Sequence, residues 1–250
     1  MNTPLPSIPN GGRLGIAEIP VLGLDAFRET VARQVEGGSA LSALFGAPAG
    51  GGIRLYAILA AADTGRLSVA ASEELGGEYP ALTPDCEQAH LFEREIAERW
   101  GVAPKGHPWL KPVRFPPPRP ASAAARPVCG VTDYFAIEGE EIHEVAVGPV
   151  HAGIIEPGHF RFQCHGETVY HLEISLGYQH RGVERAMAGG PVNRAIHYME
   201  TLAGDTTVGH ASAYSRLLES LAGCRVPARA HVIRGVVEEL ERLANHIGDL

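Results

Sequence analysis

Cysteine is scarce in this sequence and carries no metal or disulfide signature. The four cysteines lie far apart, and no Cys-x-x-Cys occurs. Iron-sulfur clusters and disulfide frameworks require cysteines in closely spaced or paired sets. We therefore expect buried thiols in a reducing compartment and no metal ligands at Cys86, Cys129, Cys164 and Cys224.

Positive charge and long apolar runs are also missing. The formal net charge is -8, so no basic stripe is available to bind nucleic acid. No stretch approaches the roughly 20 apolar residues of a membrane-spanning helix, and the opening residues lack the apolar run of a signal peptide. We expect a cytoplasmic protein, associated with a membrane peripherally through partner subunits.

Motifs for nucleotides and for serine hydrolysis are absent. The glycine run at Gly50-Gly51-Gly52 has no Lys-Ser/Thr sequel, and no Gly-x-Gly-x-x-Gly opens a helix. No Gly-x-Ser-x-Gly elbow occurs either. Any NAD would therefore bind to other subunits of an assembly rather than to this chain.

What the sequence does contain is enough apolar material for a folded protein of one large or two ordinary domains. Hydrophobic residues make up 45% of the 250 positions and charged residues 20%. The segment FPPPRPASAAARP, Phe115 to Pro127, is rich in proline and alanine and resembles an extended linker. We predict a domain over 1–115, a linker over 116–127 and a domain over 128–250.

Hydrophobic periodicity predicts a small mixed α/β unit before this linker. Helical spacing covers Leu24 to Gln34, Ile53 to Ala61 has the pattern of a buried strand, and Arg66 to Ala71 alternates as its hairpin partner. Asp85 to Trp100 has the pattern of an amphipathic helix.

After the linker the pattern predicts a short antiparallel sheet that leads into a helical domain. Alternating runs cover Ile142 to Val147, His159 to Gln163 and Thr168 to Ile174. Residues 210–221 then follow the spacing of one helix face, and a last amphipathic helix runs from Pro227 to Leu250. The fold class is therefore α+β. The uncapped apolar stripe of the last helix predicts a partner or a missing segment that covers it.

Several polar residues of the second domain are candidates for chemistry. Glu200 could relay protons if it is buried beside the apolar stripe, although a solvated glutamate is the alternative. His210 and Tyr214, four apart, would share a helix face and could bind a polar redox ligand or pack in the core. The turn His180-Arg181-Gly182-Val183-Glu184 could bind a ligand or form a structural ion pair.

Histidines are concentrated in the same region. Six lie between His151 and His197, close to Cys164, but their spacing gives no simple zinc-ligand set. Surface or hydrogen-bonded histidines are the alternative, so we predict no metal site.

An ordered series of motifs resembles the large subunits of group 4 nickel-iron hydrogenases and the homologous 49-kDa subunit of Complex I. The motifs are Gly148-Pro149-Val150-His151, Glu156-Pro157-Gly158-His159-Phe160-Arg161, His180 to Glu184, Glu200 to Tyr214, Val226 to Ala230 and Glu239 to Leu243. The first domain resembles the 30-kDa subunit of Complex I at Leu91 to Ile96, Trp100-Gly101-Val102 and Gly106-His107-Pro108. This order matches the fused large subunits of formate hydrogenlyase and hydrogenase-4 complexes.

The resemblance implies a nickel-iron centre that this sequence does not support. The hydrogenases carry Glu-Arg-x-Cys-Gly-x-Cys with a histidine four residues later, and here that motif corresponds to Glu200 through Thr206, followed by His210. Ala203 and Thr206 replace the two cysteines. Neither a methyl group nor a neutral hydroxyl replaces a soft thiolate, so a nickel-iron centre is not expected.

The Complex I-type relatives also lack these cysteines, and the resemblance implies that they use the vacated cleft for a quinone headgroup. In this chain it implies catalytic roles for Glu200, Asp205 and His210, and cofactor-binding roles for His151, His180, Arg181 and Tyr214. It also implies iron-sulfur and membrane subunits as partners. The expected function is a redox-complex subunit with a quinone- or proton-coupled site; a structural or assembly module that has lost its ligands is the alternative.

Overall fold

The computed structural model describes residues 4–116, 132–150, 157–190 and 192–250. The described residues form two compact units, Met1–Asn10 with Leu14–Gln179 and Gly11–Arg13 with His180–Leu250. They contain six α-helices and sheets in which most neighbouring strands are antiparallel. The predicted mixture of α and β structure is therefore confirmed.

A five-stranded sheet forms the centre of the first unit. Its strands are β1 (Ser7–Pro9), β2 (Val21–Leu22), β3 (Ala40–Ala49), β4 (Gly52–Ala61) and β5 (Arg66–Leu75). The order is β1-β5-β4-β3, and β2 pairs with β5 as well. The predicted hairpin is confirmed as β4 and β5, which pair antiparallel. Strand β3 was not predicted, because its small residues and Pro48 hide the alternation.

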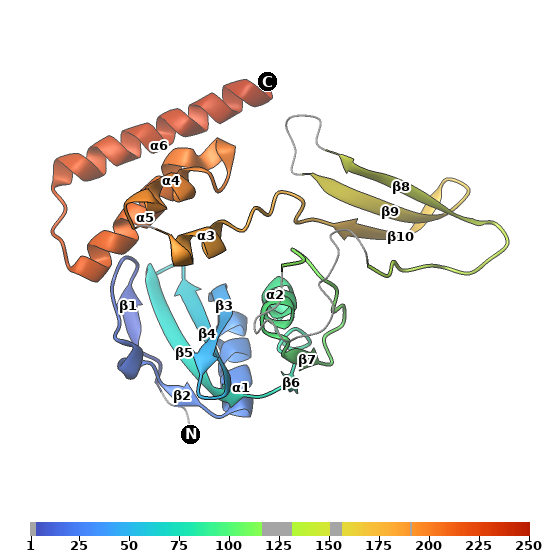
Figure 1. Ribbon diagram of the computed structural model, residues 1–250, viewed down its shortest axis with the longest axis horizontal. Helices are drawn as coiled ribbons and strands as arrows, with labels where there is room; N and C mark the ends of the chain where they lie inside the picture. Colours follow the sequence, from blue (N-terminus) through green and yellow to red (C-terminus); the bar gives the residue numbers. More distant parts are fainter. Residues whose placement is uncertain (1–3, 117–131, 151–156, 191) are drawn as a thin grey trace. The chain divides into compact units, whose positions relative to one another are not determined.

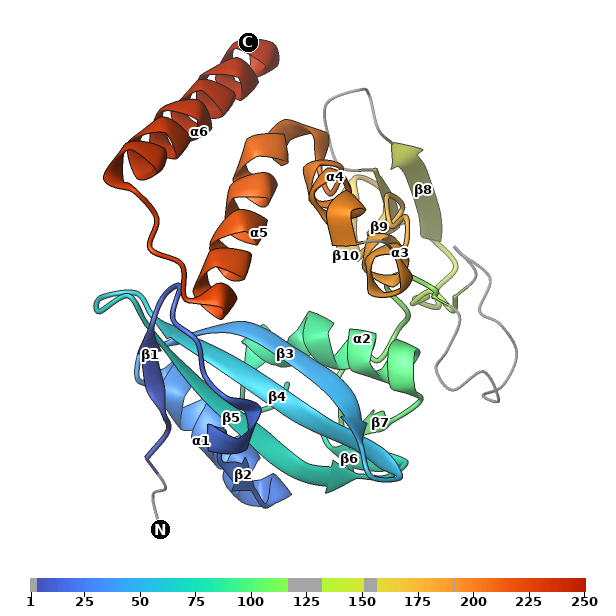
Figure 2. The same ribbon diagram turned by 60° about the vertical axis from the view of Figure 1, so that its left-hand side comes forward.

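Helix α1 (Leu24–Glu36) closes one face of this sheet, as Figures 1 and 2 show. Every second residue of β4 from Ile53 to Leu59 is buried. Phe27 and Val31 of α1 are fully buried and belong to the same apolar cluster. Burial of this apolar surface is the main stabilising contribution in this part of the molecule.

Helix α2 (His90–Trp100) packs beside β3 and starts later than predicted. Residues Glu87–Ala89 form a 3-10 turn before it, and Gly101 ends it with φ +67°, a left-handed conformation that glycine adopts at no steric cost. The short parallel strands β6 (Glu78–Pro80) and β7 (Ala103–Lys105) lie on either side of α2 in the sequence.

A buried carboxylate fixes α2 to the chain that precedes it. Glu93 is 0% exposed, and its oxygens accept hydrogen bonds from the backbone N–H of Leu82 (2.8 Å), the N–H of Thr83 (2.9 Å) and the Thr83 hydroxyl (2.6 Å). Burial, reinforced by the charge of Glu93, raises the pKa of Tyr79. A buried charge is tolerated here because donors surround it.

The three-stranded sheet of the first unit has the order β10-β9-β8 and is antiparallel throughout. The strands are β8 (Ile142–Val150), β9 (Gly158–His165) and β10 (Thr168–Ser175), which confirms the three predicted strands. One face carries apolar side chains that stay about 40% exposed, at Val145, Val147, Leu172 and Ile174. The opposite face is polar.

The second unit is helical. Its α-helices are α3 (Val183–Gly189), α4 (Ala195–Glu200), α5 (Thr207–Ala222) and α6 (Ala228–Asp249). Gly223, with φ +65°, ends α5, and Pro227 precedes α6 as its N-cap. The apolar stripe of α6 remains exposed at Val236, Leu240 and Ile247, among others. No described helix is long and apolar enough to span a membrane.

The domain boundary predicted at 116–127 falls almost wholly outside the described residues and stays a prediction. Contacts divide the described chain between Gln179 and His180 instead. The reason is that the three-stranded sheet belongs to the same compact unit as the N-terminal fold.

We expect Glu93→Gln to lower the free energy of unfolding by about 1–3 kcal/mol, because an amide nitrogen would then face N–H donors in a buried site. Urea denaturation of the purified protein measures the change. The matched control is Glu87→Gln, since Glu87 is exposed. Equal unfolding midpoints for the two variants would show that Glu93 does not anchor α2.

We also expect a pH dependence from His90, which stacks near His107 (ring centroids 5.3 Å apart) and Trp109 (5.9 Å). Burial, followed by the positive charges of Arg94 and His107, lowers the pKa of His90. The unfolded chain then binds a proton more readily, so stability is lost as pH falls from about 6.5 towards the folded pKa. The stability difference between wild type and His90→Gln should shrink over that window in urea titrations. A difference independent of pH would contradict this assignment.

Candidate functional site

The residues predicted to carry chemistry lie in the second unit, apart from His151, which is outside the described residues. Asp205 and His210 lie at the start of α5, and Glu200 ends α4. A 3-10 turn, Gly204–Thr206, leads directly into α5. Of the two positions at which the hydrogenase motif has cysteine, Ala203 directly precedes this turn and Thr206 ends it.

Thr206 and His210 are joined by hydrogen bonds. Nδ1 of His210 lies 2.8 Å from the Thr206 hydroxyl and 2.8 Å from the Thr206 carbonyl oxygen. A carbonyl oxygen can only accept, so Nδ1 carries the proton in the neutral ring and Nε2 is left as the acceptor. In the sequence His210 follows Thr206 by four residues, but a hydrogen bond between the two side chains was not predicted.

Helix α6 holds the start of α5 through a carboxylate. Glu241 accepts hydrogen bonds from the backbone N–H of Val208 (2.6 Å) and Gly209 (3.0 Å). The first N–H groups of a helix have no partner within the helix, and a carboxylate there is also favoured by the helix dipole. Asn245, one turn later, donates to the carbonyl of Asp205 at 2.7 Å. No motif or periodicity in the sequence predicts this contact of Glu241.

Two further hydrogen bonds join α5 and α6 near the other end of the helix pair. Arg234 donates to both carboxylate oxygens of Glu219, at 2.9 and 2.5 Å. This fork-to-carboxylate geometry is the most specific form of ion pair. The register of α6 on α5 is therefore fixed at both ends by polar contacts.

Glu200 is the last residue of α4 and its side chain is 39% exposed. Its carboxylate lies 3.1 Å from Nδ1 of His197, whose side chain is 74% exposed. The structure thus has the solvated glutamate that was weighed as the alternative to a buried one. Asp205 is exposed as well.

The turn at residues 180–184 contacts the end of α4. Arg181 donates from one nitrogen to the carbonyls of Thr201 and Leu202, the latter at 3.2 Å. Gly182 has φ +69° and forms the N-cap of α3. Arg181 therefore caps α4 through backbone carbonyls, a structural contact that differs from the ion pair weighed for this turn. His180 is exposed and Tyr214 is half-buried.

The donor set at this site does not fit a nickel-iron centre. Ala203 offers a methyl group, and the Thr206 hydroxyl is bonded to His210. Among the residues that the structure describes, no three His, Cys, Asp or Glu side chains come together in a way that could hold a metal ion.

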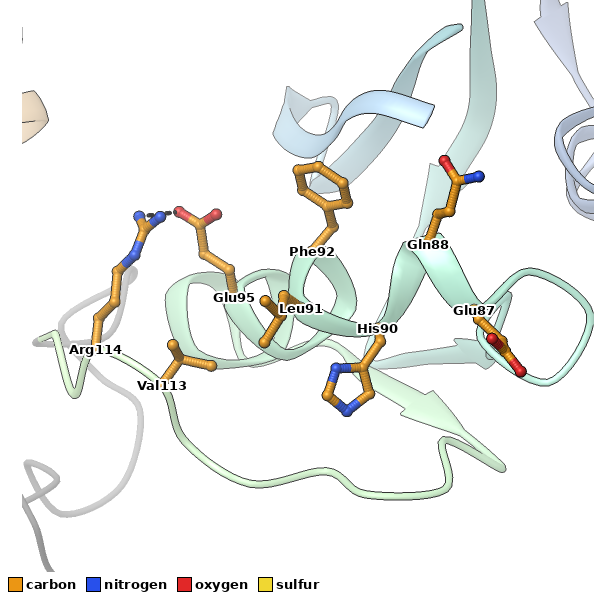
Figure 3. Close-up of a pocket in the computed structure, with 8 residues that line it drawn as sticks. All are labelled: Glu87, Gln88, His90, Leu91, Phe92, Glu95, Val113 and Arg114. Atoms are coloured by element: carbon orange, nitrogen blue, oxygen red, sulfur yellow. Dashed lines mark hydrogen bonds and ion pairs between the residues drawn. The ribbon is translucent and has the colours of Figure 1, made fainter. Parts of the chain in front are cut away.

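A hollow that sequence reasoning did not predict lies beside α2 in the first unit (Figure 3). Its volume is about 440 Å³, and its lining includes His90, Leu91 and Val113. Glu95 and Arg114 form an ion pair of 2.9 Å at its edge. None of the predicted site residues lines it.

Comparison with known proteins finds relatives among hydrogenases. The chain is 31% identical to hydrogenase-4 component G of Escherichia coli (strain K12) over 188 residues, 69% of this chain and 34% of that protein. It is 32% identical to formate hydrogenlyase subunit 5 of the same organism over 189 residues, 69% of this chain and 33% of that protein.

A second group of relatives consists of NADH-quinone oxidoreductase subunits. An NADH-quinone oxidoreductase subunit of Xanthomonas axonopodis pv. citri (strain 306) is 33% identical over 100 residues, 40% of this chain and 23% of that protein. No protein-family model matches the chain. The matched residues span about a third of the length of the two hydrogenase relatives. Over those residues, the chain is similar to the large subunits of group 4 nickel-iron hydrogenases and their Complex I homologues.

Proposed function

We propose that this chain works as a subunit of a membrane-associated oxidoreductase of the hydrogenase-4, formate hydrogenlyase or Complex I type. The observation that carries the proposal is the similarity to hydrogenase-4 component G and formate hydrogenlyase subunit 5 over 69% of the chain. In this role the chain contributes to electron transfer and shapes a quinone- or proton-coupled site.

The polar groups around the start of α5 support that site. Nδ1 of His210 is bonded to Thr206, so Nε2 is the ring nitrogen that can accept a hydrogen bond. An acceptor nitrogen of this kind can bind a donor group of a ligand. Glu200 and its partner His197 are both reached by water, so they can exchange protons with solvent. The proposed site also includes five further polar residues: Asp205, His180, Arg181, Tyr214 and His151.

A bound quinone would supply the redox chemistry, and the residues of this chain would position its headgroup. Donors and acceptors that converge in a partly apolar site are what such a headgroup requires. Thr206, His210 and Tyr214 supply the polar groups, while Glu241 fixes the helix end on which Thr206 and His210 lie. The role of Glu241 is positioning, since it acts through α5.

The partners in this proposal are an iron-sulfur subunit and membrane subunits. The chain would be held at the membrane peripherally through them, on the cytoplasmic side. Electrons from NADH would enter through other subunits, because this sequence has no dinucleotide-binding motif. Nucleic acid is not a partner in this proposal.

The second candidate function is a structural or assembly module. It is favoured by the pairing of the Thr206 hydroxyl with His210, since a hydroxyl used in this bond is less available to a ligand. The two functions differ in whether a redox cofactor accompanies the chain in its native complex.

We expect the chain, isolated from native membranes under mild conditions, to come with iron-sulfur and membrane subunits and with bound quinone. Subunit masses, iron content and extracted quinone measure this directly. Intact partners without quinone or electron-transfer activity would favour the assembly module. A chain recovered alone would contradict both functions.

Arg181→Met should lower the free energy of unfolding by about 1 kcal/mol, because two carbonyls at the end of α4 lose their donor. Urea denaturation measures the loss, and Arg185→Met provides the control, since Arg185 is an exposed arginine of the neighbouring helix α3. Unchanged stability with reduced quinone in the isolated complex would instead assign Arg181 to the cofactor.

A further inference from the structure

Residues Lys111 to Arg114, which we call the strap, are held by α2 on one side. Arg94, only 7% exposed, donates to the carbonyls of Lys111 (2.6 Å) and Pro112 (3.1 Å). Its guanidinium also lies 5.0 Å from the ring centroid of Trp109. A buried guanidinium is stable only when its donors are used, and the strap carbonyls use them.

One turn along α2, a carboxylate holds the rest of the strap. Glu98 accepts hydrogen bonds from the backbone N–H of Val113 and, at 3.1 Å, of Arg114. Burial raises the pKa of Glu98, while these amides oppose the shift. The Arg114 side chain adds its ion pair with Glu95. The strap therefore belongs structurally to the N-terminal fold.

On the other side the strap meets β10. Nζ of Lys111 lies 2.5 Å from Glu173, a residue of β10 that is 3% exposed, and the other Glu173 oxygen accepts from the N–H of Phe135 at 2.8 Å. Burial opposes ionisation of Glu173, but Lys111 and Phe135 outweigh it and hold its pKa below the usual range. Just after β10, a Cβ at Gly177 would overlap the Val113 carbonyl, so the backbones are in direct contact.

The sheet face that carries Glu173 is the polar one, and its other charges are paired within the sheet. Arg161 bonds Glu144 at 2.7 Å, and Gln163 bonds the same carboxylate at 2.8 Å. Arg161 also stacks on Tyr134 at 4.0 Å. Lys111 is thus the cation that the N-terminal fold contributes to this face.

We infer that the Lys111–Glu173 ion pair holds the three-stranded sheet on the N-terminal fold. These two parts are separated in sequence by the proline- and alanine-rich segment, yet they belong to one compact unit. If this ion pair holds the two parts together, they stay associated after the chain between them is cut. Without Lys111, Glu173 would remain buried without its ion-pair partner, which is far more costly than losing an exposed pair.

The test uses the full chain with residues 121–126 replaced by a protease site. The folded protein is cut at neutral pH, diluted stepwise and analysed by size-exclusion chromatography with mass detection. Four variants are compared with wild type: Lys111→Met, Glu173→Gln, the double variant Lys111→Met/Glu173→Leu, and Lys105→Met. Lys105 is the matched control, because its pair with Glu78 is 3.0 Å long but 64% exposed on both sides.

We expect cut wild type and Lys105→Met to stay associated, and Lys111→Met to dissociate at a concentration roughly 100-fold higher. The double variant should associate more tightly than Lys111→Met, since it leaves no unpaired charge. Glu173→Gln, which keeps the shape and the acceptor for Phe135, should also weaken association and serves if Lys111→Met does not fold. Wild-type halves that separate, or Lys111→Met and Glu173→Gln halves that associate like wild type, would overturn the inference.

Discussion

The described part of the first unit depends on two consecutive charged residues of α2, Glu93 and Arg94, both removed from water. Burying either charge would be prohibitive without compensation, and each is satisfied mainly by backbone groups of a segment that would otherwise be a free loop. Glu93 accepts hydrogen bonds from the N–H groups of Leu82 and Thr83, whereas Arg94 donates hydrogen bonds to the carbonyls of the strap. Helix α2 therefore fixes both the chain that precedes it and the strap that follows it. Lys111 of the strap in turn contacts Glu173 in the three-stranded sheet.

The sequence predicted those elements whose apolar period is undisturbed. Strands β4, β8, β9 and β10 and helices α1, α5 and α6 have clear periods of two or 3.6 residues, and all were found. Strand β3 was not predicted, because Gly46 and Pro48 interrupt its alternating pattern. The period could not reveal that the polar face of the three-stranded sheet is the one in contact with the strap. That arrangement depends on pairs such as Lys111 and Glu173, which are 62 residues apart.

The candidate site was predictable to a similar extent. The spacing of His210 from Thr206 was visible in the sequence, and so was the replacement of two thiolates by Ala203 and Thr206. The Glu241 contact was not, because a glutamate on the polar face of an amphipathic helix has the same pattern whether or not it caps a neighbour. Arg181 shows the same limit: a charged turn in the sequence became a helix cap in the structure.

Similarity to hydrogenases and the replacement of two cysteines by Ala203 and Thr206 together lead to the central claim, that this chain resembles hydrogenase large subunits but that these two positions do not fit a nickel ligand set. Nickel analysis and K-edge absorption of the complex isolated from native membranes test it most directly. The account predicts no nickel in a stoichiometric amount and no sulfur-ligated nickel spectrum. One nickel per chain with thiolate ligands would contradict it.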